Sequence, residues 1–320
     1  MRMRINMSSS LDHPTLVTAK WIEPNDLCPV LPVFNLSPFL NNTTASSTTT
    51  TTNISINELC TRLAQCLTES GALVVRDDRL KDSDNDEFLD LMEEYFESDD
   101  KYNDIRPHFH YQVGATPENT ERPRILRDSS IAQKAKSLPP DQRPTIPSGP
   151  DCKWRFFWRV GERPTHTRFP ELNAEPVIPE KFADRWSSIM TSFGDKMLNT
   201  VKTVAEMLAI GLEIDKTSFT QRMRLGAHLL APTGVDLDKY NKLGTVIAGY
   251  HYDLNFLTIH GRSRYPGLFI WLRNGQRIPV RIPKGCLLLQ AGAQLQYLTG
   301  GFIQAGYHEV CLSSTRFGRF

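Results

Sequence analysis

The chain has 320 residues, a formal net charge of +1, 40% hydrophobic residues and 23% charged residues, a composition typical of a globular protein. It has no basic stripe with interleaved aromatic residues and no apolar run of about 18 residues, so neither nucleic-acid binding nor a membrane span is expected. The N-terminal arginines lack an apolar stretch behind them, and the six cysteines form no C-x-x-C pair. We therefore expect no secretory signal and no disulfide framework, with a cytoplasmic location as the default.

The N-terminal region is predicted to combine short strands with amphipathic helices. A strand over 29–37 carries prolines, which are typical of a sheet edge. The tract 41–53 consists almost entirely of Thr, Ser and Asn, so it is expected to form a disordered loop. Ser55 followed by Glu58 is a capping-box pattern that predicts the start of a helix, and Gly71 predicts its end.

The middle of the chain is predicted to contain one short strand and two helices. The strand covers 72–75, and an amphipathic helix follows over 85–96. The aromatic patch 154–159 is interpreted either as a packed strand or as a wall of a substrate pocket. Over 180–210, apolar residues recur at steps of three and four, which predicts a long helix that supports a sheet.

From Arg222 onward, short strands separated by close turns replace the helices. The predicted strands cover 222–230, 254–259, 267–272, 277–282 and 286–290, and a last strand carries His308. Asn274-Gly275 is a strong hairpin signal. The fold class expected is mainly β with helices (α+β). The architecture is a double-stranded β-helix, or jelly roll, with an N-terminal helical region and the long supporting helix.

Three residues of this region suggest a metal site. His251 and Asp253 are two residues apart on an expected strand, so their side chains should point to the same face. His308 follows 55 residues after Asp253, and the intervening hairpins allow the chain to return to the same end of the barrel. Two imidazoles and one carboxylate, without a thiolate, are the ligand set typical of non-haem Fe(II) with open coordination positions. The alternative is that such a His-x-Asp pair is only hydrogen-bonded within a strand.

Of the remaining histidines, His260 and His228 are interpreted as structural. By strand parity His260 falls on the face opposite to His251. His228 is expected to be a core histidine, although it could line the pocket. His108 and His110 form a His-x-His pair with no third ligand in register, which favours a loop or the rim of an active site.

The residues of the C-terminal third resemble the Fe(II)- and 2-oxoglutarate-dependent dioxygenases of the isopenicillin-N-synthase-like group. The matching stretches are 251–259, Pro266 to Ile270, Asn274-Gly275, Ile282 to Gly285, Thr299 to Gly301 and His308, with weaker likeness at 31–37 and 71–75. The resemblance implies that Fe(II) and 2-oxoglutarate activate O2, with ascorbate as reductant and succinate and carbon dioxide as by-products. The expected product is a hydroxylated or otherwise oxidised small organic molecule.

The chain departs from this family in two places. The family carries an Arg-x-Ser after the distal histidine, and its arginine pairs with the far carboxylate of 2-oxoglutarate. If Ser313 occupies the position of that serine, Cys311 stands where the arginine is expected. Arg316 and Arg319 are the possible substitutes, although neither lies in the motif, and Arg316 is taken as the candidate. The family's tyrosine-containing motif before the His-x-Asp is replaced by 228–232, which has no tyrosine.

These observations lead to one interpretation with two alternatives. The chain is interpreted as an oxidoreductase with a small-molecule substrate and no nucleic-acid or membrane partner, in which His251, Asp253 and His308 hold iron. It could instead be a truncated or degenerate member that binds metal with little turnover, or a non-catalytic jelly-roll binding protein. The expected organisation is an N-terminal dioxygenase-like region (1–110), a linking segment with the long helix (111–221), and a dioxygenase core (222–320) that is truncated at its C-terminus.

Overall fold

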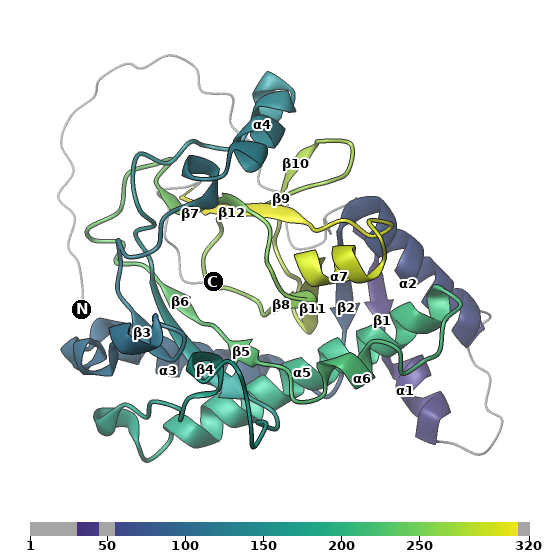
Figure 1. The fold of residues 1–320 in the computed structure, drawn as a ribbon, viewed down its shortest axis with the longest axis horizontal. Helices are drawn as coiled ribbons and strands as arrows, with labels where there is room; N and C mark the ends of the chain where they lie inside the picture. The colour runs from purple at the N-terminus through teal and green to yellow at the C-terminus, as the bar shows by residue number, and fades with distance from the viewer. Residues whose placement is uncertain (1–30, 45–54, 313–320) are drawn as a thin grey trace.

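Two four-stranded sheets face each other, and helices pack against the outer side of the first sheet (Figure 1). The computed structural model describes residues 31–44 and 55–312. The first sheet has the order β1 (Val33–Asn35), β2 (Ala72–Arg76), β11 (Cys286–Ala291) and β8 (Leu257–His260). The second has the order β10 (Arg277–Pro279), β9 (Leu268–Trp271), β12 (Tyr307–Cys311) and β7 (Val246–His251). This arrangement is the expected jelly roll, so the predicted fold class is confirmed.

A third, smaller sheet extends the fold beside the barrel. It contains β3 (Gly114–Thr116), β4 (Trp154–Val160) and β5 (His228–Leu230), and β6 (Thr233–Gly234) pairs with β4. The α-helices of the described residues are α1 (Ser37–Thr44), α2 (Ile56–Ser70), α3 (Asp82–Glu97), α4 (Ser129–Ser137), α5 (Trp186–Gly211), α6 (Thr220–Met223) and α7 (Ala293–Leu298). None of these helices is both long enough and apolar enough to span a membrane.

Strand β11 illustrates how the sequence pattern builds two cores. Every residue of β11 is buried, and its side chains alternate between the two faces of the first sheet. Leu287 and Leu289 join the large core under α2 and α5, whereas Cys286 and Leu288 join the smaller core between the two sheets. A continuous apolar run is therefore what this strand requires, because both of its faces are covered.

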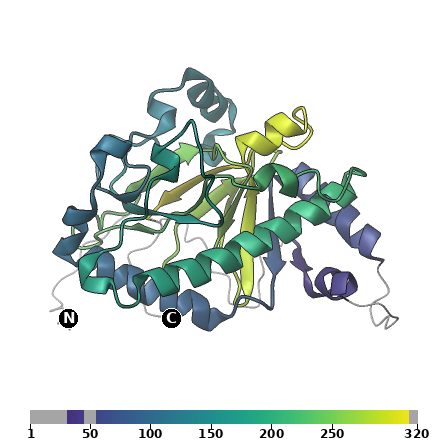
Figure 2. The same cartoon turned by 60° about the horizontal axis from the view of Figure 1, so that its bottom comes forward.

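The long helix α5 lies along the first sheet, as Figure 2 shows. Its buried residues include Trp186, Phe193 and Leu208, which belong to the predicted apolar stripe. The helix begins at Trp186, and residues 180–182 of the predicted span form a separate 3-10 turn. Pro179 immediately precedes that turn and helps to separate it from the preceding chain, because proline disfavours a helical conformation in the residue before it.

The predictions for the N-terminal region are largely confirmed. The Ser55 hydroxyl accepts a hydrogen bond from the Glu58 backbone N–H at 3.1 Å, and Gly71, with a φ of 75°, ends α2. Strand β1 lies at the sheet edge. The loop predicted over 41–53 is wrong for residues 41–44, which form the end of α1, and its remaining residues lie outside the described part of the chain. Helix α1 is anchored by Phe39, which is buried in the core.

Several strand boundaries in the C-terminal region differ from the prediction. The strand predicted over 222–230 is interrupted, because α6 ends at Met223 and Leu225 has a φ of 59°, so that only β5 remains extended. The strand predicted over 254–259 begins later than expected, at Leu257 in β8. The strand predicted over 277–282 ends earlier than expected, at Pro279 in β10. Helix α7 was not predicted. The hairpin at Asn274-Gly275 is confirmed, since Gly275 has a φ of 85° between β9 and β10.

Candidate metal centre

His251 and His308 come from two neighbouring strands of the second sheet. His251 is the last residue of β7, and His308 on β12 is its direct partner in the antiparallel register. Cross-strand partners on one face lie close together, and the centroids of the two imidazole rings are 4.3 Å apart. The tertiary pairing thus brings together two histidines that lie far apart in the sequence.

Asp253 lies just beyond β7, at the start of a loop over 253–256 that we call the metal loop. The first turn of α7 holds this loop in place, because the Ala293 backbone N–H donates to the Asp253 carbonyl at 2.8 Å and the Gln294 N–H donates to the Asn255 carbonyl at 3.0 Å. Helix α7 begins with N–H groups that lack partners within the helix, and the carbonyls of the metal loop satisfy two of them.

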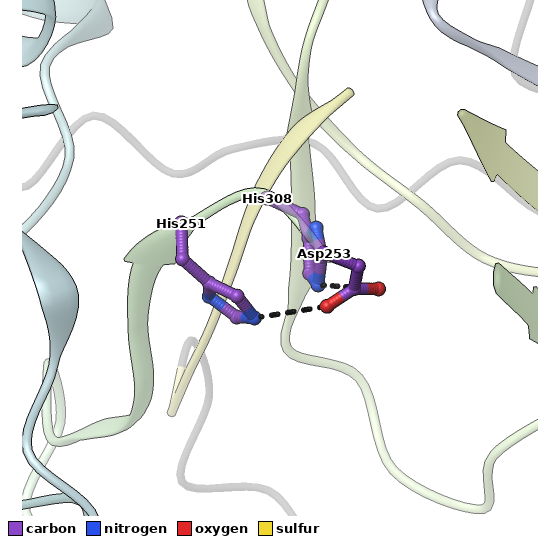
Figure 3. Close-up of side chains that lie close together, drawn as sticks. All are labelled: His251, Asp253 and His308. Atoms are coloured by element: carbon purple, nitrogen blue, oxygen red, sulfur yellow. Dashed lines mark ion pairs between the residues drawn. The ribbon is translucent and has the colours of Figure 1, made fainter. Parts of the chain in front are cut away.

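The three side chains converge, as Figure 3 shows. The Nε2 atom of His251 lies 3.5 Å from Oδ1 of Asp253, and the Nε2 atom of His308 lies 3.9 Å from Oδ2. One potential ligand atom from each residue lies within 4.8 Å of the other two. The side chain of His308 is 6% exposed, whereas those of His251 and Asp253 are 26% and 27% exposed. Two nitrogens and one oxygen therefore surround a point that solvent can reach from one side.

The protonation states of Asp253 and His308 suit metal binding. Burial raises the pKa of Asp253, but the hydrogen bond from His251, the charges of both imidazoles and the Thr258 hydrogen bond outweigh it, so the pKa lies far below its usual range. Burial lowers the pKa of His308 to about 3, and the neighbouring His251 adds to this effect. An ionised carboxylate and a neutral imidazole are the forms that coordinate a metal.

Hydrogen bonds from neighbouring groups orient two of the three candidate ligands. His251 Nδ1 lies 2.6 Å from the Gly249 carbonyl, which can only accept, so the Nδ1 atom carries the proton and Nε2 keeps its lone pair. The Thr258 hydroxyl donates to Oδ2 of Asp253, and the Asn255 side-chain amide donates to Thr258 at 2.8 Å. Asn255 and Thr258 lie in the stretch 251–259 that resembles the family, but the sequence pattern alone indicates no role for them.

His260 faces the metal centre, contrary to the sequence-based interpretation. Its ring centroid lies 5.9 Å from that of His308, and the Nε2 atom lies 3.1 Å from Oε1 of Gln290. Parity did not carry over from His251 to His260, because the metal loop interrupts the extended chain between β7 and β8. Burial lowers the pKa of His260, so it is a neutral, hydrogen-bonded neighbour of the centre.

A charged cluster of Arg155 on β4, Lys153 just before it and Glu121 from the loop after β3 lies near the candidate ligands. Arg155 pairs with Glu121 at 2.6 Å, and Lys153 pairs with the same carboxylate at 2.9 Å. Arg155 also interacts electrostatically with Asp253, and Glu121 with His251. The core-facing residues of the same strand are Trp154, Phe156 and Trp158. The packed-strand interpretation of the 154–159 patch is therefore confirmed, and Arg155 on the same strand lies near Asp253.

The other candidates from the sequence do not join this centre. His108 lies in a short 3-10 turn that His110 ends, and within the described residues the group of His251, Asp253 and His308 is the one set of three or more that could hold a metal ion. His228 is half-buried, and its Nε2 atom lies 2.9 Å from the Met223 carbonyl. Arg316 lies outside the described residues.

Residues 234–319 match the model of the 2OG-Fe(II) oxygenase superfamily. This segment contains all three converging side chains and extends past His308 to include Arg316. The C-terminal part of this chain is therefore similar to the 2OG-Fe(II) oxygenase superfamily. The expected resemblance is thus confirmed at the level of the superfamily. A search of curated proteins finds no match.

Solved structures of oxygenases resemble the whole described fold and not only this core. A full-length protein of Neurospora crassa in complex with alpha-KG has a TM-score of 0.66 at 17% identity, covering 89% of this chain and 80% of that one. A 2OG-Fe(II) oxygenase family protein from Caulobacter crescentus has a TM-score of 0.64 at 18% identity, with coverages of 88% and 80%. AtDAO1 of Arabidopsis thaliana has a TM-score of 0.54 at 13% identity, with coverages of 89% and 88%. At such identities the likeness establishes the jelly-roll fold.

Proposed function

We propose that this chain is an oxygenase that uses Fe(II), 2-oxoglutarate and O2 to hydroxylate or otherwise oxidise a small organic substrate. His251, Asp253 and His308 are the proposed iron ligands. The observation that carries the proposal is the convergence of two imidazoles and one carboxylate at a partly exposed point of an oxygenase fold. The absence of a thiolate from this set favours Fe(II) over a structural zinc.

Iron bound by these residues would supply, together with 2-oxoglutarate, the activation of O2 that the substrate's oxidation requires. The protein contributes three fixed ligands on one side, which leaves the other coordination positions free. The Gly249 carbonyl keeps His251 in the tautomer that presents Nε2, and Thr258 holds the carboxylate of Asp253. Such hydrogen bonds behind the ligands pre-organise the site, so little reorganisation is needed when iron enters.

Arg316 is the proposed partner of the far carboxylate of 2-oxoglutarate. The family match continues through residue 319, which supports counting this tail as part of the oxygenase core. A guanidinium binds a carboxylate through two parallel hydrogen bonds, which a lysine or a neutral side chain replaces poorly. Arg319 lies in the same tail and provides a matched control position.

The substrate is proposed to lie between the metal centre and β4. Arg155 and the half-buried Phe157 alternate with the core residues of this strand, and the guanidinium lies 3.9 Å from the centroid of the Phe157 ring. A charged group stacked on an aromatic ring provides both a polar and an apolar contact for a small organic molecule. Small-molecule complexes of similar structures support this class of substrate, namely the Neurospora crassa protein with thymine and JOX2 with JA.

The experiment that tests the proposal is an anaerobic titration of the purified chain with Fe(II) and then with 2-oxoglutarate. A weak visible charge-transfer band is expected when both are bound, and His251→Ala should abolish iron binding and the band. Arg316→Met should raise the 2-oxoglutarate concentration at which the band is half-developed by about tenfold or more, because a charge-assisted hydrogen bond is lost. Arg319→Met should leave this concentration unchanged.

Two outcomes would contradict the proposal. Iron binding without the band would support the metal-binding alternative with little or no turnover. A chain that fails to bind iron at all would leave the non-catalytic jelly-roll alternative.

A further inference from the structure

A cavity separate from the metal centre lies between α2 and the β9–β10 hairpin. Its volume is about 380 Å³, and its lining includes Phe34, Arg62, Ser70, Leu272 and Arg273. None of the proposed iron ligands lines it. A cavity of this size can hold a small organic molecule.

Arg273 has an unusual electrostatic environment in this cavity. Burial alone lowers the pKa of its guanidinium, with no opposing contribution from a carboxylate. Its Nη2 atom is buried and has no hydrogen-bond partner, and no ion pair joins Arg273 to any other residue in the ranges that the structure covers. Arg277, four residues further on, shows the usual arrangement, because it pairs with Glu309 at 2.6 Å. A desolvated charge without a counter-charge is costly, and an anion bound in the cavity, whose lining includes Arg273, would provide a counter-charge.

Arg62 brings a second cation to the same cavity from α2. It is exposed, and no ion pair involves it within the described residues. One acidic side chain, Glu69, also lines the cavity, but its carboxylate accepts a hydrogen bond from the Gln65 amide at 2.7 Å. The cavity therefore contains two guanidinium groups and one carboxylate, which leaves an excess of one positive charge.

Part of the cavity lining is apolar. Phe34 and Leu272 are 5% and 8% exposed, and Pro32 lies next to them in the lining. The volume also exceeds what an inorganic phosphate ion alone would fill. The shape and the chemistry thus favour an anion that carries an apolar group.

We propose that this cavity binds a small organic phosphate, with the phosphate facing Arg273 and Arg62 and the organic part against Phe34 and Leu272. Two guanidinium groups suit a phosphate ligand better than a ligand with one carboxylate, because each guanidinium can donate parallel hydrogen bonds to the phosphate oxygens. The proposal does not depend on the metal centre.

Calorimetric titration of the full chain at low ionic strength tests this proposal with benzyl phosphate as the probe. Saturable binding of one molecule per chain is expected, together with weaker binding of inorganic phosphate and no binding of benzyl alcohol. Because phosphate can also bind to iron, the titration is repeated with His251→Ala, in which the binding should persist.

Variants of the two arginines assign the site. Arg273→Met should weaken benzyl phosphate binding at least tenfold, Arg62→Met should weaken it less, and the matched control Arg168→Met, at an exposed position in the loop after β4, should leave it unchanged. Without ligand, Arg273→Met should not lower the melting temperature, because it removes a desolvated charge that has no partner.

Each of the opposite results overturns the proposal. These are the absence of saturable benzyl phosphate binding, equal affinities for benzyl phosphate and benzyl alcohol, or equal affinities for benzyl phosphate and inorganic phosphate. Unchanged binding in Arg273→Met would likewise exclude this cavity as the site. A lower melting temperature of Arg273→Met without ligand would show that the arginine has a structural role instead.

Discussion

The hydrogen bond from Thr258 to Asp253 provides the sharpest test of the metal centre. Thr258→Val keeps the shape and the β-branched side chain of β8 but removes the hydroxyl that donates to Oδ2 of Asp253. It also removes the acceptor of the Asn255 amide. The substitution therefore loosens the carboxylate without deleting a ligand.

The expected loss follows from the kind of bond that is removed. A hydrogen bond to a charged group contributes about 1.5–3 kcal/mol, which corresponds to a ~10- to ~150-fold change in an equilibrium constant. Loss of a group that orients a metal ligand typically weakens metal binding about 10- to 100-fold. We therefore expect the Fe(II) dissociation constant of Thr258→Val to rise by one to two orders of magnitude.

Anaerobic calorimetric titration with Fe(II) measures this change directly. The control is Thr61→Val, the same substitution on α2, where the hydroxyl donates to the Asn57 carbonyl of its own helix. Its iron affinity should equal that of the unmodified chain. An unchanged dissociation constant in Thr258→Val, with the fold retained, would refute the idea that this hydrogen bond organises the iron ligands.

Three further predictions concern the same centre. His251→Ala should abolish iron binding, measured by metal analysis after gel filtration. His260→Ala should retain iron binding but have a lower melting temperature. Equal loss of iron in both variants would make His260 a ligand. The folded-state pKa of His308, about 3 against an ordinary 6.5, means that the unfolded chain takes up a proton that the folded metal-free chain does not. The stability contributed by neutral His308 is thus present above about pH 6.5 and is lost as the pH falls toward about 3. At pH 5 the free energy of unfolding should be about 2 kcal/mol lower for this reason. In urea unfolding, His308→Gln should lose less of its free energy of unfolding over the same pH range than the unmodified chain does. Gly292→Ala would place a Cβ 2.0 Å from a backbone carbonyl oxygen of the metal loop. We therefore expect its free energy of unfolding to fall by about 1–3 kcal/mol and its iron binding to weaken. Gly149→Ala, with open space around it, should match the unmodified chain in unfolding and in iron binding.

Local sequence patterns predicted the elements whose structure depends on local interactions. The Ser55 cap, the Gly71 helix end and the Asn274-Gly275 turn are each determined by a few neighbouring residues, and all are confirmed. Helix α7 was missed because it is short and its role depends on the carbonyls of the metal loop. The strand predicted at 222–230 failed because Leu225 adopts a left-handed conformation that no residue pattern there indicates.

The candidate metal centre also combines features that follow from local sequence with features that depend on the tertiary fold. The sequence by itself predicted the types of the proposed ligands and their order, since His251, Asp253 and His308 provide two imidazoles and one carboxylate in an oxygenase-like pattern. Only the tertiary structure decided that His251 and His308 are cross-strand partners and that His260 also faces the centre. The reason is physical: side-chain direction follows from alternation only while a strand stays extended, and the metal loop interrupts that alternation between β7 and β8.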